Sequence, residues 1–510
     1  MPIALPRALP RLNRFLCVSP WLLSLWLALS GLTASAGPLP EEIASALARA
    51  QVPPDAISLL LVDADGQSAP RLSWRADVMA NPASVMKLVT TAAALDLLGP
   101  TYTWRTPVWV QGRVNNGVLT GNLVIAGQGD PALTLEKLWL LLRRVQGLGI
   151  HKIDGDIVLD RSAFAALNGN AGDFDGEPLR PYNASPDALL INFKSVLMTF
   201  VPDPANQVAR VQIDPPLWGV EMPGSVPLNS ARPEACGDYR GELKADFSDP
   251  ARIRFTGSYP VGCGEKVWPV AYVDPGSYAA RTVEGLWRSL GGKLTGSTHD
   301  GSAPADSPTF EVTSPTLAEV IHDINKFSNN VMAQQVFLTL ARDRSAAVPQ
   351  APANFQAAQE VVRQWWLQRI SPPTAAAPAT QPPALPVPLM DNGAGLSRQA
   401  RISAAGLARV LQTAYLSPFM PELMASLPVV GLDGTLRHSH AASASAHLKT
   451  GSLRDVLAVA GYVHGSNGHH LCLVAIINHP NASAARVAMD AVVDWAAAQA
   501  NKRIVLPAGR

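Results

Sequence analysis

The chain has 510 residues, of which 47% are hydrophobic and 16% are charged, and its formal net charge is +1. A chain of this length does not usually fold around a single compact core, so we expect about two to four domains. The near-zero charge, without a run of five or more like charges, argues against a nucleic-acid-binding protein and indicates no polyanionic partner.

The N-terminal residues have the layout of an export signal. Arginines precede a leucine-rich apolar run, and the small-residue triplet Ala34-Ser35-Ala36 follows it as a cleavage site. The alternative is an uncleaved membrane anchor, which the short run, broken by Ser19 and Pro20, disfavours. We therefore expect a signal peptide over 1–36, a periplasmic location and no stable transmembrane segment.

Hydrophobic spacing predicts helices toward both ends of the chain and a region rich in short strands between them. The expected helices are 40–50, 84–98, 133–148, 282–290, 316–339 with a break at 327–330, 354–370, 404–414 and 484–500. The expected strands are 56–62, 71–75, 106–110, 121–125, 155–160, 456–463 and 470–477. Asn354 and Ser403 are expected to cap helices. Residues 371–388 contain seven prolines, which predicts an extended linker or loop.

Three cysteines follow the predicted signal peptide. Cys236 and Cys263 lie in the β-rich region, where an exported compartment permits a disulfide, and the sequence leaves open whether they are bridged. Cys472 lies in an apolar run that predicts a buried strand, so we expect an inert thiol. No CxxC spacing suggests a zinc site.

A serine and a lysine three residues apart, Ser84 and Lys87, begin the most apolar predicted helix. A helical turn takes about 3.6 residues, so the two side chains share one face. This geometry suits a serine nucleophile whose proton is taken by a lysine with a lowered pKa.

Two further short patterns follow in order along the chain. They are Ser328-x-Asn330 and Lys449-Thr450-Gly451. Together with Ser84-x-x-Lys87 they match the signature of β-lactamases and penicillin-binding proteins, apart from the middle residue of the second motif. Each pattern alone is weak, because a serine is often a helix cap and a lysine often lies on a solvated face. In this combination we interpret all three as catalytic.

Acyl transfer needs a nucleophile, a base, a proton donor for the leaving group and an oxyanion hole. We assign the nucleophile to Ser84 and the base to Lys87, with Ser328 as proton relay and Asn330 as the group that orients the lysine. The remaining assignments concern the substrate. Lys449 and Thr450 would bind a terminal carboxylate, Gly451 would let the substrate backbone approach, and the amides of Ser84 and Ser452 would form the oxyanion hole.

The gap between the first two motifs is much longer than a helical subdomain needs. With this gap and the motifs at 129–133, 391–398 and 427–436, the chain resembles class C low-molecular-mass penicillin-binding proteins, the D-alanyl-D-alanine carboxypeptidase/endopeptidase family. The resemblance implies an α+β fold, in which an antiparallel sheet lies between helices and two smaller β-rich domains are inserted. The implied domains are 37–100 plus 303–510 (catalytic), 101–200 plus 271–302 (inserted) and 201–270 (second insertion).

The resemblance also implies the substrate, namely the D-Ala-D-Ala or D-Ala–diaminopimelate end of peptidoglycan peptides, and acylation by β-lactams. No metal or organic cofactor is implied. Asp160 and Arg398 match positions that hold the free end of the diaminopimelate side chain, and the alternative for them is a surface ion pair. The chain departs from the family at Arg454, where a neutral residue is expected, and at Ala394, where a serine is usual.

Two other classes of protein remain as alternatives. A β-lactamase would need a dedicated deacylating base, and the long insertion is atypical of that class. A binding module that senses wall peptides would need no intact catalytic motifs, whereas all three are present here. Within the preferred class, the sequence leaves open the balance between carboxypeptidase and endopeptidase activity.

Overall fold

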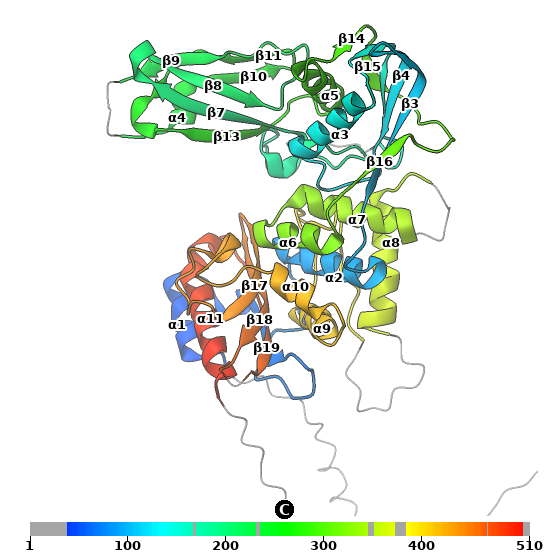
Figure 1. Ribbon diagram of the computed structural model, residues 1–510. Helices are drawn as coiled ribbons and strands as arrows, with labels where there is room; N and C mark the ends of the chain where they lie inside the picture. Colours follow the sequence, from blue (N-terminus) through cyan, green and yellow to red (C-terminus); the bar gives the residue numbers. More distant parts are fainter. Residues whose placement is uncertain are drawn as a thin grey trace, which may run out of the picture. The chain divides into compact units, whose positions relative to one another are not determined.

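The computed structural model describes residues 38–166, 170–230, 235–344, 351–372, 384–466 and 468–502 (Figure 1). The predicted signal peptide and residues 373–383 of the proline-rich segment lie outside this part. Among the described helices, none is long and apolar enough to cross a membrane. The mixture of helices and several sheets confirms the predicted α+β class.

The first and last parts of the chain together build one antiparallel sheet of five strands, in the order β17-β18-β19-β1-β2. Its strands are β1 (Ile57–Asp63), β2 (Leu72–Trp74), β17 (Ala446–Leu453), β18 (Val456–His464) and β19 (His470–Asn478). The register places Leu60 opposite Val474. β17 lies at the edge of the sheet, and residues 428–430 hydrogen-bond to the first part of its outer side, at residues 446–448.

Both faces of this sheet are buried. In β19, Leu471, Leu473, Ala475 and Ile477 pack into one core, and Cys472, Val474 and Ile476 into another. Helices α1 (Glu41–Arg49) and α11 (Arg486–Ala500) contribute to the first core, and α2 (Lys87–Leu98) and α9 (Ala404–Tyr415) to the second. The strand is therefore apolar from Leu471 to Ile477, because it faces hydrophobic side chains on both sides.

A helical region covers the second face and contains the predicted break near Ser328. It consists of α2, α6 (Leu317–Phe327), α7 (Asn330–Arg344), α8 (Phe355–Trp365), α9 and α10 (Met420–Ser426). Ser328 ends α6 in the left-handed conformation, with φ of 60°. The caps at Asn354 and Ser403 are confirmed, since their side chains accept the Ala357 and Gly406 amides at 2.9 and 3.0 Å. Helix α10 was not predicted.

The region between Ser84 and Ser328 forms two further large sheets and a small one. A seven-stranded sheet contains β3 (Arg105–Asn115), β4 (Val118–Ala126), β5 (Lys152–Asp154), β6 (Ile157–Asp160), β14 (Lys293–Leu294), β15 (Thr298–Asp300) and β16 (Phe310–Thr313). A five-stranded sheet contains β7 (Ser195–Asp203), β8 (Val208–Asp214), β9 (Ser225–Asn229), β12 (Tyr259–Pro260) and β13 (Lys266–Ala271). β10 (Ala245–Asp249) pairs with β11 (Arg252–Phe255).

Helices α3 (Leu135–Gly147) and α5 (Tyr278–Ser289) share one hydrophobic core with both large sheets. The expected helix at 282–290 thus begins earlier, at Tyr278. The predicted domain boundaries stay predictions. β7 spans the boundary expected near residue 200, and β16 follows the one expected at 302.

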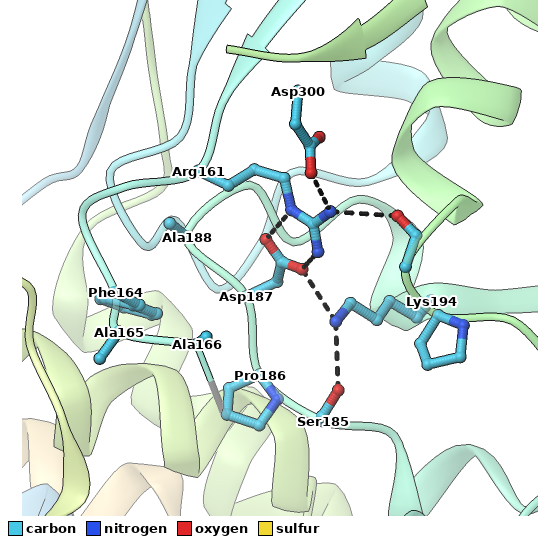
Figure 2. A pocket seen from close by; sticks show the side chains of 12 residues that line it. Arg161, Phe164, Ala165, Ala166, Ser185, Pro186, Asp187, Ala188, Lys194 and Asp300 are labelled. Atoms are coloured by element: carbon cyan, nitrogen blue, oxygen red, sulfur yellow. Dashed lines mark hydrogen bonds and ion pairs between the residues drawn. The ribbon is translucent and has the colours of Figure 1, made fainter. Parts of the chain in front are cut away.

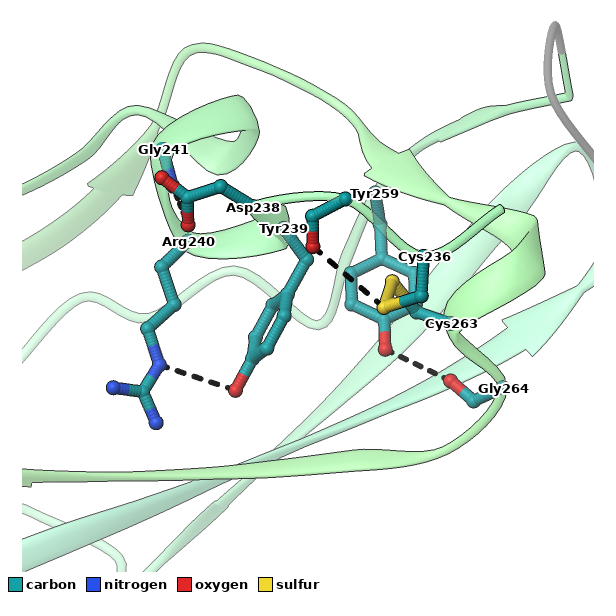
Figure 3. Close-up of a disulfide and its surroundings, with 9 residues drawn as sticks. Cys236, Asp238, Tyr239, Arg240, Gly241, Tyr259, Cys263 and Gly264 are labelled. Atoms are coloured by element: carbon teal, nitrogen blue, oxygen red, sulfur yellow. Dashed lines mark hydrogen bonds between the residues drawn. A yellow bond between two sulfur atoms is a disulfide. The ribbon is translucent and has the colours of Figure 1, made fainter.

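A disulfide joins Cys236 to Cys263 beside the five-stranded sheet, with the two Cα atoms 4.4 Å apart (Figure 3). The bridge spans 27 residues. A disulfide that closes a loop of this size restricts the unfolded chain and thereby stabilises the folded state by about 3 kcal/mol. Nearby, the Tyr259 hydroxyl donates to the Gly264 carbonyl at 2.8 Å. Cys472 is free and buried, as expected, and burial raises the pKa of its thiol.

Candidate active site

Ser84 lies in a short 3₁₀ turn, η3 (Ala83–Met86), that leads directly into α2. The turn is anchored to the sheet by two asparagines. The Asn81 amide donates to Asn478 Oδ1 at 2.8 Å, and Asn478 Nδ2 returns a hydrogen bond to the Asn81 carbonyl at 2.9 Å. The Asn81 side chain then accepts the Ala83 amide at 2.9 Å. Ser84 is thus held at a fixed place above the sheet.

Lys87 lies one turn further on and is completely buried. Its Nζ contacts Ser84 Oγ at 2.8 Å, Asn330 Oδ1 at 2.6 Å and the Ala394 carbonyl oxygen at 2.7 Å. Burial, and second to it the nearby charge of Lys449, holds the pKa of Lys87 well below its usual value. The lowered pKa favours the neutral amine, which is able to accept a proton.

The second motif lies between the two lysines. Lys449 Nζ donates to Ser328 Oγ at 2.9 Å, while Asn330 contacts Lys87. The structure therefore brings the five residues predicted as catalytic into one connected group (Ser84, Lys87, Ser328, Asn330 and Lys449). Asn330 makes one further contact, from its Nδ2 to the Tyr182 carbonyl oxygen at 3.1 Å.

The third motif lies in the edge strand β17. A Cβ atom on Gly451 would lie 2.4 Å from the Pro82 carbonyl oxygen and 3.1 Å from the Ser84 amide nitrogen, so only glycine permits this approach of strand and turn. The Thr450 hydroxyl pairs with that of Thr435 at 2.7 Å, and Ser452 is exposed. Lys449 is fully buried, and this burial lowers its pKa to about 7.

The two residues predicted to hold the diaminopimelate side chain have different partners. The Asp160 carboxylate accepts the Ser162 and Ala303 amides at 2.8 and 2.7 Å. Arg398 is exposed, 3.8 Å from the Asp455 carboxylate and over the ring of Phe174. Arg398 therefore forms a surface ion pair, which is the alternative considered for it above. The role of Asp160 and Arg398 in binding substrate stays a prediction.

Several positioning contacts were not found in the sequence. Lys326, just before the second motif, is buried and donates to the Leu427 carbonyl at 2.7 Å and to Asp433 at 2.8 Å. The Asp433 carboxylate also accepts the Val429 amide at 2.7 Å. These bonds hold residues 427–436, which carry Thr435, next to the end of α6. In the sequence, the motif at 427–436 was the feature that could have indicated these contacts.

A cavity of about 380 Å³ lies away from these residues, in the inserted region (Figure 2). Its charged side chains pair with one another. Asp187 accepts from Arg161 and from Lys194, the latter at 2.8 Å, and Arg161 also pairs with Asp300 at 3.0 Å. Gln335 of α7 bonds both the amide and the carbonyl of Asp187. We interpret this network as a structural connection between the inserted region and α7.

The buried lysines Lys87, Lys194 and Lys449 have lowered pKa values, which predict a pH-dependent stability. The unfolded chain binds more protons than the folded chain between the folded pKa of Lys449, about 7, and the ordinary lysine value. The free energy of unfolding therefore rises with pH in this window. Lys449 alone should add roughly 1.5 kcal/mol from about pH 7 to about pH 8.5, below the range in which tyrosines titrate, and the lowered pKa of Lys87 adds to this rise.

Urea unfolding at several pH values would measure this rise. Lys449→Met should reduce the rise without abolishing it, because the lowered pKa of Lys87 also contributes. A wild-type stability that stays flat or falls over the same window would contradict the prediction.

A serine bonded to a buried lysine, beside a second Ser/Asn pair and an edge-strand lysine, is the arrangement of enzymes that transfer acyl groups through an active-site serine. The sequence profile of the D-Ala-D-Ala carboxypeptidase 3 (S13) family matches residues 39–499. The chain therefore belongs to this family of serine peptidases, which confirms the resemblance found in the sequence.

Individual relatives agree with this placement. The D-alanyl-D-alanine carboxypeptidase of Actinomadura sp. (strain R39) is 26% identical over 430 residues, which cover 80% of this chain and 75% of the relative. DacB of Haemophilus influenzae is 25% identical over 404 residues, or 78% and 80% of the two chains. The crystal structure of penicillin binding protein 4 (dacB) from H. influenzae aligns with a TM-score of 0.68 at 22% identity, over 88% of this chain and 96% of that one. The structural likeness supports the fold.

Proposed function

We propose that the protein is a periplasmic D-Ala-D-Ala carboxypeptidase and DD-endopeptidase that cleaves peptidoglycan stem peptides and cross-links through an acyl-enzyme on Ser84. We also propose that β-lactams acylate the same serine. The observation that carries this proposal is the contact of Ser84 Oγ with the buried Lys87 at 2.8 Å. The relatives named D-alanyl-D-alanine carboxypeptidase support the substrate class, and the H. influenzae protein has been crystallised with a β-lactam.

The surroundings of Lys87 favour one arrangement of its protons. Asn330 Oδ1 and the Ala394 carbonyl are acceptors only, so a neutral amine directs its two N–H bonds to them. The lone pair then faces the Ser84 hydroxyl. Ser84 Oγ attacks the D-Ala carbonyl carbon as its proton moves to Lys87 Nζ, and the amides of Ser84 and Ser452 stabilise the oxyanion.

Collapse of the tetrahedral intermediate breaks the C–N bond. The proton held by Lys87 passes through the Ser328 hydroxyl to the leaving nitrogen, which departs as D-Ala or as the cross-linked amine. Water then attacks the ester carbonyl, Lys87 takes its proton, and Ser84 regains a proton as the acid product leaves. The Ser84 proton thus leaves with the amine product, and a proton from water restores the Ser84 hydroxyl.

Lys449 supplies the anchor for the carboxylate next to the scissile bond. Burial disfavours the charged amine and lowers its pKa to about 7. A bound carboxylate favours the charged form and raises this pKa. Substrate binding would therefore favour the protonated Lys449 that binds the substrate carboxylate. Thr450 would donate the second hydrogen bond to that carboxylate.

Purified protein incubated with pentapeptide monomers and with cross-linked dimers would test the proposal, with products identified by mass. We expect loss of the terminal D-Ala from monomers and conversion of dimers into monomers. Persistence of the dimers would remove the endopeptidase activity from the proposal. If neither substrate changes and no penicillin adduct forms, the binding-module alternative is favoured. Rapid hydrolysis of penicillin without action on the peptides would favour a β-lactamase.

A further inference from the structure

The Asn330 side chain is held between two partners that require opposite ends of its amide. Its Oδ1 accepts from Lys87 Nζ at 2.6 Å, and its Nδ2 donates to the Tyr182 carbonyl oxygen at 3.1 Å. Asn330 is buried, with 7% exposed. A reversed amide would place Oδ1 against the Tyr182 carbonyl, so two acceptors would face each other. The Tyr182 carbonyl therefore selects the observed orientation.

This orientation matters for the base. If the amide were reversed, Nδ2 would donate to the lone pair of a neutral Lys87. That lone pair is the group proposed to take the Ser84 proton, so the reversed state would compete with the nucleophile for the base. A carbonyl oxygen at this position avoids the competition, because it accepts an N–H bond and leaves the lone pair free.

Tyr182 is fixed by a single carboxylate of the inserted region, that of Asp175. The Tyr182 hydroxyl donates to Asp175 Oδ2 at 2.9 Å, and Asn183 Nδ2 donates to Oδ1 at 2.8 Å. Oδ1 also accepts the Glu177 amide at 3.0 Å. Asp175 thus binds both Tyr182 itself and its neighbour, on the two sides of the peptide whose carbonyl meets Asn330.

The same segment, 170–183, contacts the catalytic region at a second place. Arg398 lies over the ring of Phe174, with 5.0 Å between the guanidinium carbon and the ring centroid. Two points of contact restrict how the segment can shift, so the Tyr182 carbonyl keeps its place when Asp175 is intact.

We propose that Asp175 is a positioning residue for catalysis, which acts through Tyr182 to keep the Asn330 amide in the orientation that leaves Lys87 free as the base. The inference rests on the proposed function, since it concerns the same serine and lysine. It assigns to the inserted region a part in the chemistry, although the three motifs all lie outside that region.

Acylation by a fluorescent penicillin, followed over a range of pH, would test the role of Asp175. In Asp175→Ala we expect the plateau rate to fall about fivefold, the effect of losing one ordinary hydrogen bond. The midpoint of the acid limb should also move to lower pH. An ammonium that loses its carbonyl acceptor is less stable, so the pKa of Lys87 falls further. Among the described residues, the charged group acting on Lys87 is Lys449.

Asp173→Ala is the matched control, because this carboxylate lies in the same segment and accepts the Asn170 amide at 2.8 Å. It should acylate at the wild-type rate with the wild-type midpoint. Tyr182→Phe removes the hydroxyl while keeping the carbonyl and should show a smaller shift in the same direction, and it decides the question if Asp175→Ala fails to fold. Thermal unfolding would identify that failure.

Wild-type behaviour of Asp175→Ala would overturn the inference. A lower plateau with an unchanged midpoint would also overturn it, because a merely structural role reduces the amount of competent enzyme without changing Lys87. Failure of the proposed function is distinguishable, since the wild type itself would then form no penicillin adduct.

Discussion

Ser84→Ala is expected to abolish covalent labelling by fluorescent penicillin and to lower peptide cleavage by at least about 10⁴-fold. The other serine hydroxyl of the motifs, that of Ser328, contacts Lys449 at 2.9 Å, whereas Lys87 contacts Ser84 at 2.8 Å. Removing Oγ therefore leaves the base without a nucleophile to activate. Intact-protein mass spectrometry would record the adduct on the wild type and its absence on the variant.

Ser68→Ala is a suitable control for this substitution. Ser68 is exposed, so its loss should leave labelling at the wild-type rate. Ser84→Ala should unfold near the wild-type temperature, because the truncation removes one half-exposed hydroxyl and leaves Lys87 with its contacts to Asn330 and Ala394. Labelling of Ser84→Ala at the wild-type rate would place the nucleophile elsewhere and would exclude the acyl-enzyme proposed here.

The central sheet and the motif-bearing helices could be predicted because their signals are local. The run around Cys472 is apolar at every position, which is typical of a strand covered on both faces, and the caps at Asn354 and Ser403 follow from residue type and position. Short elements were harder. Helix α10 spans only seven residues and contains Pro421, so it offers little periodicity. The disulfide depends on the distance between two Cα atoms, which spacing along the chain does not determine.

The contacts that position the catalytic residues had no local signal. Asn330 and Tyr182 are 148 positions apart, and Asn81 and Asn478 are 397 apart. Each pair forms because the fold places two backbones side by side, and an asparagine is a common residue in any loop. The ionic network around Asp187 is similar, since Arg161 and Lys194 come from different elements. Sequence thus predicted which residues react, and the fold was needed to find what holds them.

Lys87→Met should lower the rate of acylation by about 10³-fold while leaving the protein folded. Lys87 and Lys449 both lie in the site with lowered pKa values, so the pKa alone does not decide which of them is the base. Their contacts separate them, because Lys87 touches the nucleophile and Lys449 touches Ser328. Methionine keeps the length of the side chain and removes the proton acceptor, so Ser84 would have to ionise without help.

Comparison of Lys87→Met with Lys449→Met would separate the base from the anchor. Saturation kinetics with a penicillin should show a lower maximal acylation rate for Lys87→Met. For Lys449→Met, which loses the partner of the ligand carboxylate, the main effect should be that a higher penicillin concentration is needed for half-saturation. Lys266→Met, at an exposed position of β13, should behave as the wild type. The acid limb of the pH profile should disappear in Lys87→Met, because the group that titrates there is gone. Acylation of Lys87→Met within tenfold of the wild-type rate, with the acid limb intact, would assign the base to another residue.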